Sequence, residues 1–419
     1  MSDYDVIIIG GGPAGAGAAI HLARAGASVL LAEQQKFPRA KLCGEFISPE
    51  CLGHFARLGV LEGMAGAGGA SVSETVFYTR RGTSIAVPSA WFGGGRGGAL
   101  GLSRAEMDSQ LLSRARAAGV EVLEEASFSG LLIDEARRVR GVRLKPAVGD
   151  ERVISSLVTL DATGRQRVVA RRFERETERG GVVVGAGRAR PTLVAFKSHL
   201  EGAQGDARSC EIYFYKGGYG GLSPVEGGLS NLCFIASARD VRACGSDAGR
   251  VMREVLMRNT RAAATLKGAR VVTEWLGVAL ESFGRHEPVP ADGLLAVGDA
   301  AAFIDPFTGS GMLMALESGE LAAAVLADWL PRARACDSGD SGGGNLDFQA
   351  LASVYRARYG ERFDSRLRLC GLLRRAAFAP PSLTEIATLA LRSSARLRRV
   401  VARATRGHDV SQALRVKRP

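Results

Sequence analysis

The N-terminal part of the chain alternates between strand-like and helix-like hydrophobic patterns. Residues 5–9 form a short apolar run rich in β-branched side chains, and residues 16–25 repeat apolar positions at helical spacing. Gly26 ends the helical pattern, and a second apolar run over residues 28–32 ends at Glu33. A strand, a helix and a strand in this order predict a β-α-β unit, whose two strands are parallel.

Farther along the chain, a second kind of architecture interrupts the first. A helical stretch over residues 104–118 and strands over residues 120–123 and 157–160 continue the α/β pattern. Strand-like segments then follow one another over residues 191–282, and the α/β pattern returns at residues 293–299. We predict an α/β fold (α+β overall), in which a doubly wound Rossmann-like domain is interrupted by a β-rich domain and followed by a helical C-terminal region. The predicted segments are 1–75, 101–190 and 286–336 for the Rossmann-like domain, 76–100 and 191–285 for the β-rich domain, 337–345 for a linker, and 346–419 for the C-terminal region.

The turn after the first predicted strand carries the motif Gly10-x-Gly12-x-x-Gly15. In a dinucleotide-binding unit, the first glycine permits a tight turn, the second lets a pyrophosphate approach the backbone, and the third lets helix and strand pack closely. The helix N-terminus offers free N–H groups to the phosphates. An acid at the position of Glu33 accepts hydrogen bonds from ribose hydroxyls and disfavours a 2′-phosphate. The sequence therefore predicts a cofactor with an adenosine diphosphate moiety, either FAD or NAD.

Three further segments indicate the family that this chain resembles. Residues 298–312 (GDAAAFIDPFTGSGM) precede a long helical pattern, residues 38–45 are PRAKLCGE, and Arg104 is followed by Asp108. With the N-terminal unit, these motifs resemble the FAD-dependent family of geranylgeranyl reductases, flavin-dependent halogenases and aromatic-ring hydroxylases (p-hydroxybenzoate hydroxylase-like proteins). The geranylgeranyl-reductase-like members are the most similar. The resemblance covers roughly residues 4–330. It implies an FAD-dependent oxidoreductase that acts on a hydrophobic small molecule.

The resemblance also implies which residues bind FAD. Asp299 corresponds to an aspartate at the ribityl or pyrophosphate region, and the N–H groups of Gly311 and Met312 correspond to donors at the pyrimidine edge of the ring. A helix N-terminus placed there stabilises the negative charge of the reduced ring. No metal site is predicted, because the five histidines lack metal-ligand spacing. The predicted cofactor-binding residues are Gly10, Gly12, Ala14, Gly15, Glu33, Cys43, Gly44, Arg104, Phe128, Asp299, Gly309, Gly311 and Met312.

Within that set, four residues carry over from shorter motifs. Cys43 and Gly44 correspond to the segment that passes beside the flavin, and Phe128 to a residue whose backbone contacts adenosine. Arg104 corresponds to an arginine that reaches the cofactor, with a surface arginine at a helix start as the alternative.

The sequence constrains the reaction less than it constrains the cofactor. Halogenases of this family usually carry Trp-x-Trp-x-x-Pro where residues 217–228 of this chain contain no tryptophan. Hydroxylases usually carry Asp-Gly in place of Thr163-Gly164, which puts direct docking of NADH or NADPH in question. Prenyl reductases share the segments 41–44 and 305–311. We rank monooxygenation (hydroxylation or epoxidation) first, reduction of a C=C bond second and halogenation third. The non-catalytic alternative is a flavoprotein that binds a lipid or a partner.

A C=C reductase needs a proton donor opposite the hydride donor. Cys43, Glu45 and Tyr219 are the candidate catalytic residues for this step. Each has a structural alternative: a small buried side chain for Cys43, a helix cap for Glu45 and a sheet tyrosine for Tyr219. NADH or NADPH, or an electron-donor protein, would supply the electrons.

Composition narrows the cellular setting. With 46% hydrophobic and 23% charged residues the chain is globular. No apolar run approaches the roughly 20 residues that span a bilayer. Seven cysteines, an odd number without a CxxC pair, favour a reducing compartment over a disulfide framework. We therefore expect a cytoplasmic protein.

The net charge of +12 is located in the C-terminal region. From residue 355 onward, 16 Lys and Arg residues stand against 4 Asp and Glu residues, while the preceding residues hold 39 of each sign. A capping box at Ser382 and Glu385 precedes apolar positions at helical spacing, which predict an amphipathic helix. Its apolar face packs on the protein or, alternatively, makes peripheral contact with an anionic membrane. No basic-aromatic interleaving accompanies the charge, so we expect no nucleic-acid partner. The basic stripe consists of Arg392, Arg396, Arg399 and Arg403.

Overall fold

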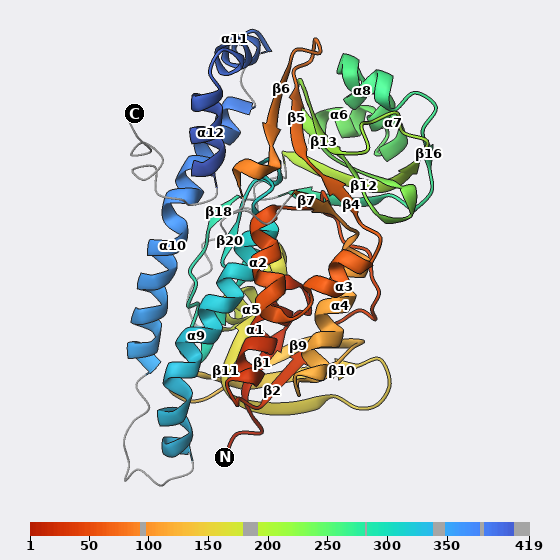
Figure 1. The fold of residues 1–419 in the computed structure, drawn as a ribbon. Helices are drawn as coiled ribbons and strands as arrows, with labels where there is room; N and C mark the ends of the chain where they lie inside the picture. The colour runs from red at the N-terminus through yellow and green to blue at the C-terminus, as the bar shows by residue number, and fades with distance from the viewer. Residues whose placement is uncertain (93–97, 179–191, 281–282, 338–347, 378–380, 406–419) are drawn as a thin grey trace, which may run out of the picture.

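The computed structural model describes residues 1–92, 98–178, 192–280, 283–337, 348–377 and 381–405 (Figure 1). Its first sheet has seven strands: β1 (Tyr4–Ile9), β2 (Val29–Ala32), β8 (Glu121–Leu123), β9 (Ala126–Ile133), β10 (Val139–Pro146), β11 (Arg152–Asp161) and β19 (Leu294–Ala296). The parallel part has the order β8-β2-β1-β11-β19, and β10 and β9 continue from β11 with antiparallel pairing. The predicted β-α-β unit is therefore present, with β2 and β11 on either side of β1.

Both faces of the first sheet are covered. The helices around it are α1 (Pro13–Arg24), α2 (Pro49–Leu58), α3 (Leu61–Gly66), α4 (Arg104–Ala117), α5 (Val168–Glu178) and α9 (Gly311–Asp337). Val6 and Ile8 of β1 belong to a core shared with α1, α4 and α9, whereas Ile7 and Ile9 belong to a core shared with β9, β10 and α5. The alternation arises because successive side chains of a strand point to opposite faces.

A second sheet lies beside the first, at the top of Figure 1. Its eight strands are β5 (Glu74–Tyr78), β6 (Ser84–Pro88), β12 (Leu193–Glu201), β13 (Ser209–Tyr215), β14 (Gly218–Pro224), β15 (Ser230–Ser237), β16 (Arg270–Val271) and β17 (Leu276–Leu280). The order is β16-β12-β15-β14-β13-β5-β6, with β17 also paired to β12. Two distant stretches of the chain build this sheet, because β5 pairs with β13 in parallel.

Three short helices cover the outer face of the second sheet: α6 (Ala238–Ala243), α7 (Ala248–Glu254) and α8 (Thr260–Thr265). The sequence analysis expected strand-like segments throughout this region and missed these helices. Helices of six or seven residues are too short to show a clear 3.6-residue period. Their starts are instead stabilised by N-cap side chains, which belong to Ser237, Asp247 and Asn259.

Two small sheets accompany the large ones. One contains β3 (Phe46–Ile47), β4 (Ala70–Val72) and β7 (Ala99–Gly101), and the other contains β18 (Gly284–Arg285) and β20 (Ala302–Phe303). The architecture confirms the predicted fold class, a doubly wound Rossmann-like domain interrupted by a β-rich domain. The individual segment boundaries stay predictions. Of the predicted linker 337–345, only Asp337 is described, and it ends α9.

The C-terminal region is helical, as predicted, but its amphipathic stretch is broken. Helix α10 (Phe348–Ala377) runs along α9, where Glu317 accepts hydrogen bonds from Arg362 and Arg366 at 2.7 Å each (Figure 1). The stretch predicted as one helix forms α11 (Pro381–Arg392) and α12 (Ala395–Ala404), because Ser394 caps the start of α12. These two helices lie beside β6 and the short 3-10 helix η1 (Ser89–Trp91). Among the described helices, none combines the length and apolar character needed to cross a bilayer.

Candidate active site

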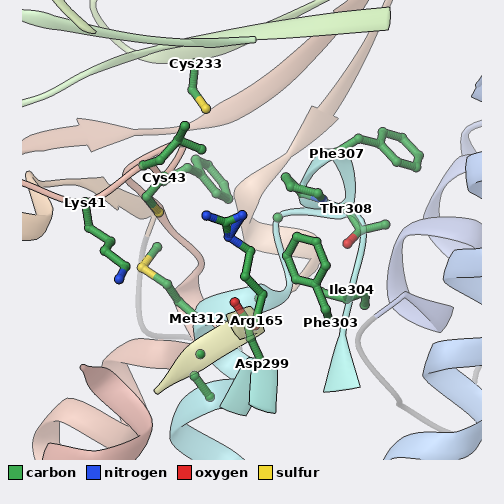
Figure 2. Close-up of a pocket in the computed structure, with 18 of the residues that line it drawn as sticks. Lys41, Cys43, Arg165, Cys233, Asp299, Phe303, Ile304, Phe307, Thr308 and Met312 are labelled. Atoms are coloured by element: carbon green, nitrogen blue, oxygen red, sulfur yellow. The ribbon is translucent and has the colours of Figure 1, made fainter. Parts of the chain in front are cut away.

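A cavity of about 700 Å³ extends from the first sheet to the second (Figure 2). Its first end is lined by residues that directly follow β1, β2, β11 and β19. Its second end is lined by the inner face of the second sheet and by residues of α11 and α12. Ligands of open α/β sheets bind outside the carboxyl ends of the strands. This cavity is therefore the candidate active site.

The start of α1 has the shape that a pyrophosphate requires. Gly12 is the N-cap residue of α1 and lines the cavity, and a Cβ atom built on it would meet only Arg104 Nη2, 3.8 Å away. The helix start therefore offers N–H groups and open space to a ligand. Gly15 has a different environment: it does not line the cavity, and its Cβ atom would lie 2.0 Å from the carbonyl oxygen of Gly10. Gly12 leaves room for a ligand, and Gly15 leaves room for the contact between helix and strand.

A network of four charged side chains, three of them buried, forms the neighbouring wall. Arg39 donates hydrogen bonds to Glu33 Oε2 at 3.3 Å and to Asp108 Oδ2 at 3.0 Å. Arg104 contacts both oxygens of Asp108, at 2.6 and 2.9 Å, and Glu33 also accepts the N–H of Gly11 at 3.0 Å. Buried charges that are paired and hydrogen-bonded hold one another in place. Glu33 and Arg104 are thus oriented by the protein itself.

Asp299, Gly311 and Met312 lie on the opposite side of this end of the cavity. Asp299 belongs to the 3-10 helix η5 (Gly298–Ala300) after β19, and Gly311 and Met312 begin α9. Burial raises the pKa of Asp299 to about 6, although Arg104 and Arg165 oppose the shift. Within the described part of the chain, the Asp299 carboxylate has no hydrogen-bond or ion-pair partner. A desolvated carboxylate at a cavity wall is suited to accept hydrogen bonds from ligand hydroxyls. The residues present therefore fit FAD.

Cys43 lies where the cofactor end of the cavity meets the second sheet (Figure 2). The N–H of Glu45 donates to Cys43 Sγ at 3.4 Å, and the side chain of Asn231 in β15 donates to the Cys43 carbonyl at 3.0 Å. Burial raises the pKa of the Cys43 thiol, although Arg104 opposes the shift. The thiol is therefore protonated at neutral pH.

Glu45 holds the turn that carries Cys43. Its carboxylate accepts hydrogen bonds from the N–H of Arg104 at 2.9 Å and from Lys197 Nζ at 2.8 Å, and His199 Nε2 lies 2.6 Å from its second oxygen. Burial pushes the pKa of Glu45 upward, but His199, Lys197 and the Arg104 N–H outweigh it, so the pKa lies below 4.5. Glu45 is ionised at neutral pH. These hydrogen bonds to the start of α4 and to Lys197 favour a positioning role over proton donation, and the catalytic role of Glu45 stays a prediction.

The hydroxyl of Tyr219 is engaged in hydrogen bonds within the protein. Its hydroxyl donates to Asp305 Oδ1 and accepts the N–H of Phe307 at 3.0 Å. Burial and the neighbouring Asp305 carboxylate raise the pKa of Tyr219 well above its ordinary value. Asp305 in turn lies 3.0 Å from Arg374 of α10. Tyr219 therefore ties β14 to the loop before α9.

The structure places all the predicted site residues around this cavity except Gly15. Sequence reasoning missed several charged residues that line the cavity or hold its walls. Lys197 and His199 offered one signal, since they interrupt an apolar strand at positions that share a face, and a buried lysine needs an anionic partner. The missed residues are Arg39, Lys41, Asp108, Arg165, Lys197, His199 and Asp305.

Comparison with known proteins places this site in a family. The family model described as "FAD binding domain" matches residues 3–335. A digeranylgeranylglycerophospholipid reductase from Methanosarcina mazei is 31% identical over 76% of this chain and 74% of that protein. A menaquinone reductase from Mycobacterium tuberculosis is 29% identical over 90% of this chain and 85% of that protein. These matches confirm the resemblance inferred from the motifs.

Solved structures agree at the level of the fold. A flavin-dependent brominase has a TM-score of 0.75 at 22% identity, covering 96% of this chain and 93% of that one. A geranylgeranyl bacteriochlorophyll reductase-like protein from Thermoplasma acidophilum has a TM-score of 0.71 at 21% identity, covering 99% and 96%. At these identities the two structures show a shared fold.

The first prediction concerns the cofactor. The purified protein should release FAD on denaturation, and Gly12→Val should remain folded but contain no flavin, because the new side chain occupies the space for the pyrophosphate. Chromatography of the released flavin and circular dichroism measure the two outcomes. Gly15→Val is the matched control. It should fail to fold, since its Cβ atom would collide with Gly10. Release of FMN, or full FAD content in Gly12→Val, would contradict the assignment.

The second prediction concerns the buried ion cluster. Glu45→Gln leaves Lys197 without a buried anion and should lower the free energy of unfolding by about 3–5 kcal/mol. Denaturant titration of the FAD-loaded protein measures this change. The double variant Glu45→Gln/Lys197→Met removes both charges and should recover part of the loss.

The same cluster predicts a pH dependence. The pKa of Glu45 is lower in the folded protein than the ordinary value of 4.5, so its stabilisation is present above about pH 4.5 and disappears as the pH falls through the folded value. The stability difference between wild type and Glu45→Gln should therefore shrink below pH 4.5. A difference that stays constant with pH would show that the carboxylate charge is not responsible.

Proposed function

This chain belongs to the FAD-dependent oxidoreductases of the family described as FAD binding domain, and we propose that it reduces a C=C bond in a hydrophobic amphiphile. The observation that carries the proposal is the position of Cys43. Its protonated thiol lies between the residues that fit FAD and the apolar wall of the second sheet. Reduced FAD, when bound, supplies the hydride equivalent. The protein must supply the proton and the binding site for the double bond.

The second end of the cavity suits a hydrophobic substrate. Phe77 and Phe214 of the second sheet and Phe307 before α9 form an aromatic cluster, with ring centroids 6.2–6.4 Å apart. Ile85 and Val87 of β6 continue this wall. Such a surface binds an apolar chain by removing it from water. The names of two relatives, digeranylgeranylglycerophospholipid reductase and menaquinone reductase, support a lipid-like substrate.

Cys43 is the best supported of the three predicted proton donors. Glu45 is ionised, and the Tyr219 hydroxyl already donates a hydrogen bond to Asp305. Donation from Cys43 would form a C–H bond on the substrate and leave a thiolate. The Glu45 N–H and the nearby Arg104 guanidinium would stabilise that thiolate. Arg104 and the Glu45 N–H would thus stabilise the Cys43 thiolate after proton transfer. Before the transfer, burial keeps the Cys43 thiol protonated.

Monooxygenation, which the sequence analysis ranks first, stays the second candidate. It needs no acid at the substrate carbon, and the apolar second end of the cavity would exclude water, which that chemistry requires. The relatives' names favour reduction over this alternative.

The third prediction separates these reactions. FAD-loaded protein reduced anaerobically with dithionite, NADH or NADPH should convert a digeranylgeranylglycerophospholipid or menaquinone to a product heavier by two hydrogen atoms, as measured by mass spectrometry. Comparing the three donors also tests whether a nicotinamide can serve, or whether a donor protein is needed. A product that forms only in air and is heavier by one oxygen atom would assign the chain to the monooxygenases. No product with any donor would favour a non-catalytic lipid-binding role.

The same assay tests Cys43. Cys43→Ser should slow product formation by about 10²–10⁴-fold, the usual contribution of a general acid, while dithionite still reduces the flavin normally. Cys233→Ser is the matched control, because Cys233 also lines the cavity but lies on β15. Its turnover should stay within a few-fold of wild type. An effect of Cys43→Ser no larger than that of the control would remove Cys43 from the mechanism.

We also propose peripheral membrane contact through the outer faces of α11 and α12. Leu389 and Leu397 are 57% and 46% exposed, and Arg392, Arg396 and Arg399 are exposed beside them. Basic side chains near an anionic surface contribute about 1 kcal/mol each. A lipid-like substrate would be extracted from such a surface.

The fourth prediction tests this contact. Arg392→Gln/Arg396→Gln should weaken binding to anionic vesicles by about 30-fold, from about 1 kcal/mol per charge, with FAD content unchanged. Co-sedimentation with vesicles measures the binding. Arg239→Gln/Arg242→Gln removes two arginines of α6 and should leave binding unchanged. An equal loss of vesicle binding in both double variants would show that the binding depends only on the net charge of the protein.

A further inference from the structure

An arginine lines the cavity far along the chain from the predicted cofactor residues. Arg398 belongs to α12, and the residues of α12 that line the cavity are Arg398, Val401 and Ala402, followed by Thr405 just beyond the helix. This spacing of three and four residues places the four side chains on one face of the helix. Arg398 therefore faces inward, whereas its neighbours Arg396, Leu397 and Arg399 are exposed.

In the part of the chain that the structure describes, Arg398 lacks the anionic partner that an inward arginine needs. Its Nε atom is buried without a hydrogen-bond partner, and among the residues that the structure describes no carboxylate forms an ion pair with it. Its guanidinium carbon lies 6.0 Å from the ring centroid of Trp91. An aromatic face compensates only part of the cost of removing a guanidinium from water. The cavity thus contains a cation whose buried Nε donor has no partner among the described residues.

The surroundings of Arg398 are basic. Arg399 lies 5.2 Å from the Trp91 ring centroid, and Arg403 Nε donates to the Trp91 carbonyl at 3.3 Å. No acidic side chain pairs with either arginine within the described ranges. Three guanidinium groups around one tryptophan favour an anion at this end of the cavity.

We propose that Arg398 binds the phosphate of an amphiphilic ligand whose apolar chain lies in the cavity. The planar guanidinium presents paired N–H donors that match a phosphate, and a ligand phosphate would satisfy the buried Nε. Val401, one helical turn after Arg398, lines the cavity and is apolar, so the chain leaves the phosphate into an apolar environment. In Figure 2 Phe307 lies between Cys43 and the ribbon of the C-terminal helices, so the chain would pass this ring to reach the cofactor end.

The inference deepens the proposed function, since it states how the substrate is oriented. The binding step does not depend on turnover, and it can be measured with oxidised, FAD-loaded protein. The guanidinium of Arg398 would also bind free phosphate, and the experiment distinguishes free phosphate from the phosphate of a lipid headgroup.

The fifth prediction concerns this binding step. Geranylgeranyl phosphate, geranylgeraniol and inorganic phosphate are titrated separately into FAD-loaded protein by calorimetry, below the concentration at which the lipids form micelles. Arg398→Gln should weaken geranylgeranyl phosphate binding by about 10- to 100-fold, the usual range for a charged hydrogen bond. Binding of the uncharged geranylgeraniol should be unchanged. Arg368→Gln, which removes an exposed arginine of α10 that does not line the cavity, is the matched control and should change neither affinity.

Four outcomes would overturn the proposal. Equal weakening of the phosphate and the alcohol would show that Arg398 only shapes the wall. An equal effect of Arg368→Gln would indicate general electrostatics. No effect of Arg398→Gln would exclude the contact, and inorganic phosphate binding as tightly as geranylgeranyl phosphate would assign the site to free phosphate. If Arg398→Gln does not fold, Arg398→Lys keeps the charge and loses the paired donors, and it should weaken the phosphate ligand selectively.

Discussion

The cavity depends on one carboxylate that water cannot reach. Glu45 is fully buried, and a buried charge is stable only when paired and hydrogen-bonded. Its partners come from both halves of the molecule: the N–H of Arg104 starts α4 on the first sheet, and Lys197 and His199 belong to β12 of the second. The same cluster holds Glu45 in the left-handed backbone region, at φ 52°. Satisfying this single charge therefore sets how the two sheets meet and where Cys43 lies.

The two ends of the cavity are formed by different kinds of interaction. At the cofactor end, Arg39 links Glu33 to Asp108, so the groups that face an adenosine diphosphate are ordered by buried ion pairs. At the second end, Phe214 and Phe307 and the neighbouring aliphatic side chains remove apolar surface from water. The charged end therefore suits the adenosine diphosphate part of FAD, and the second end suits an apolar chain.

The arginines of the C-terminal helices lie in two different environments, which the net charge of the region does not separate. Arg392 and Arg396 are exposed on the outer faces of α11 and α12. Arg398, two residues after Arg396, faces the cavity. The difference arises from the helical period, which turns the chain by about 100° per residue. Arginines that are close in sequence are therefore partly exposed on the surface and partly turned toward the cavity.

The sequence by itself determined the features that depend on local spacing. The β-α-β unit, the glycine turn before α1, the acid Glu33 and the return of the α/β pattern before Asp299 are each legible within about 30 residues, the length of one such unit. Only the tertiary structure decided that Glu45 is ion-paired, because its partner Lys197 lies 152 residues away in the chain. It also decided that Tyr219 is committed to Asp305 and that Arg398 faces the cavity. The periodicity of a segment indicates which of its faces is buried. The partner of a buried charge depends instead on how distant elements pack, and no local sequence pattern predicts that packing.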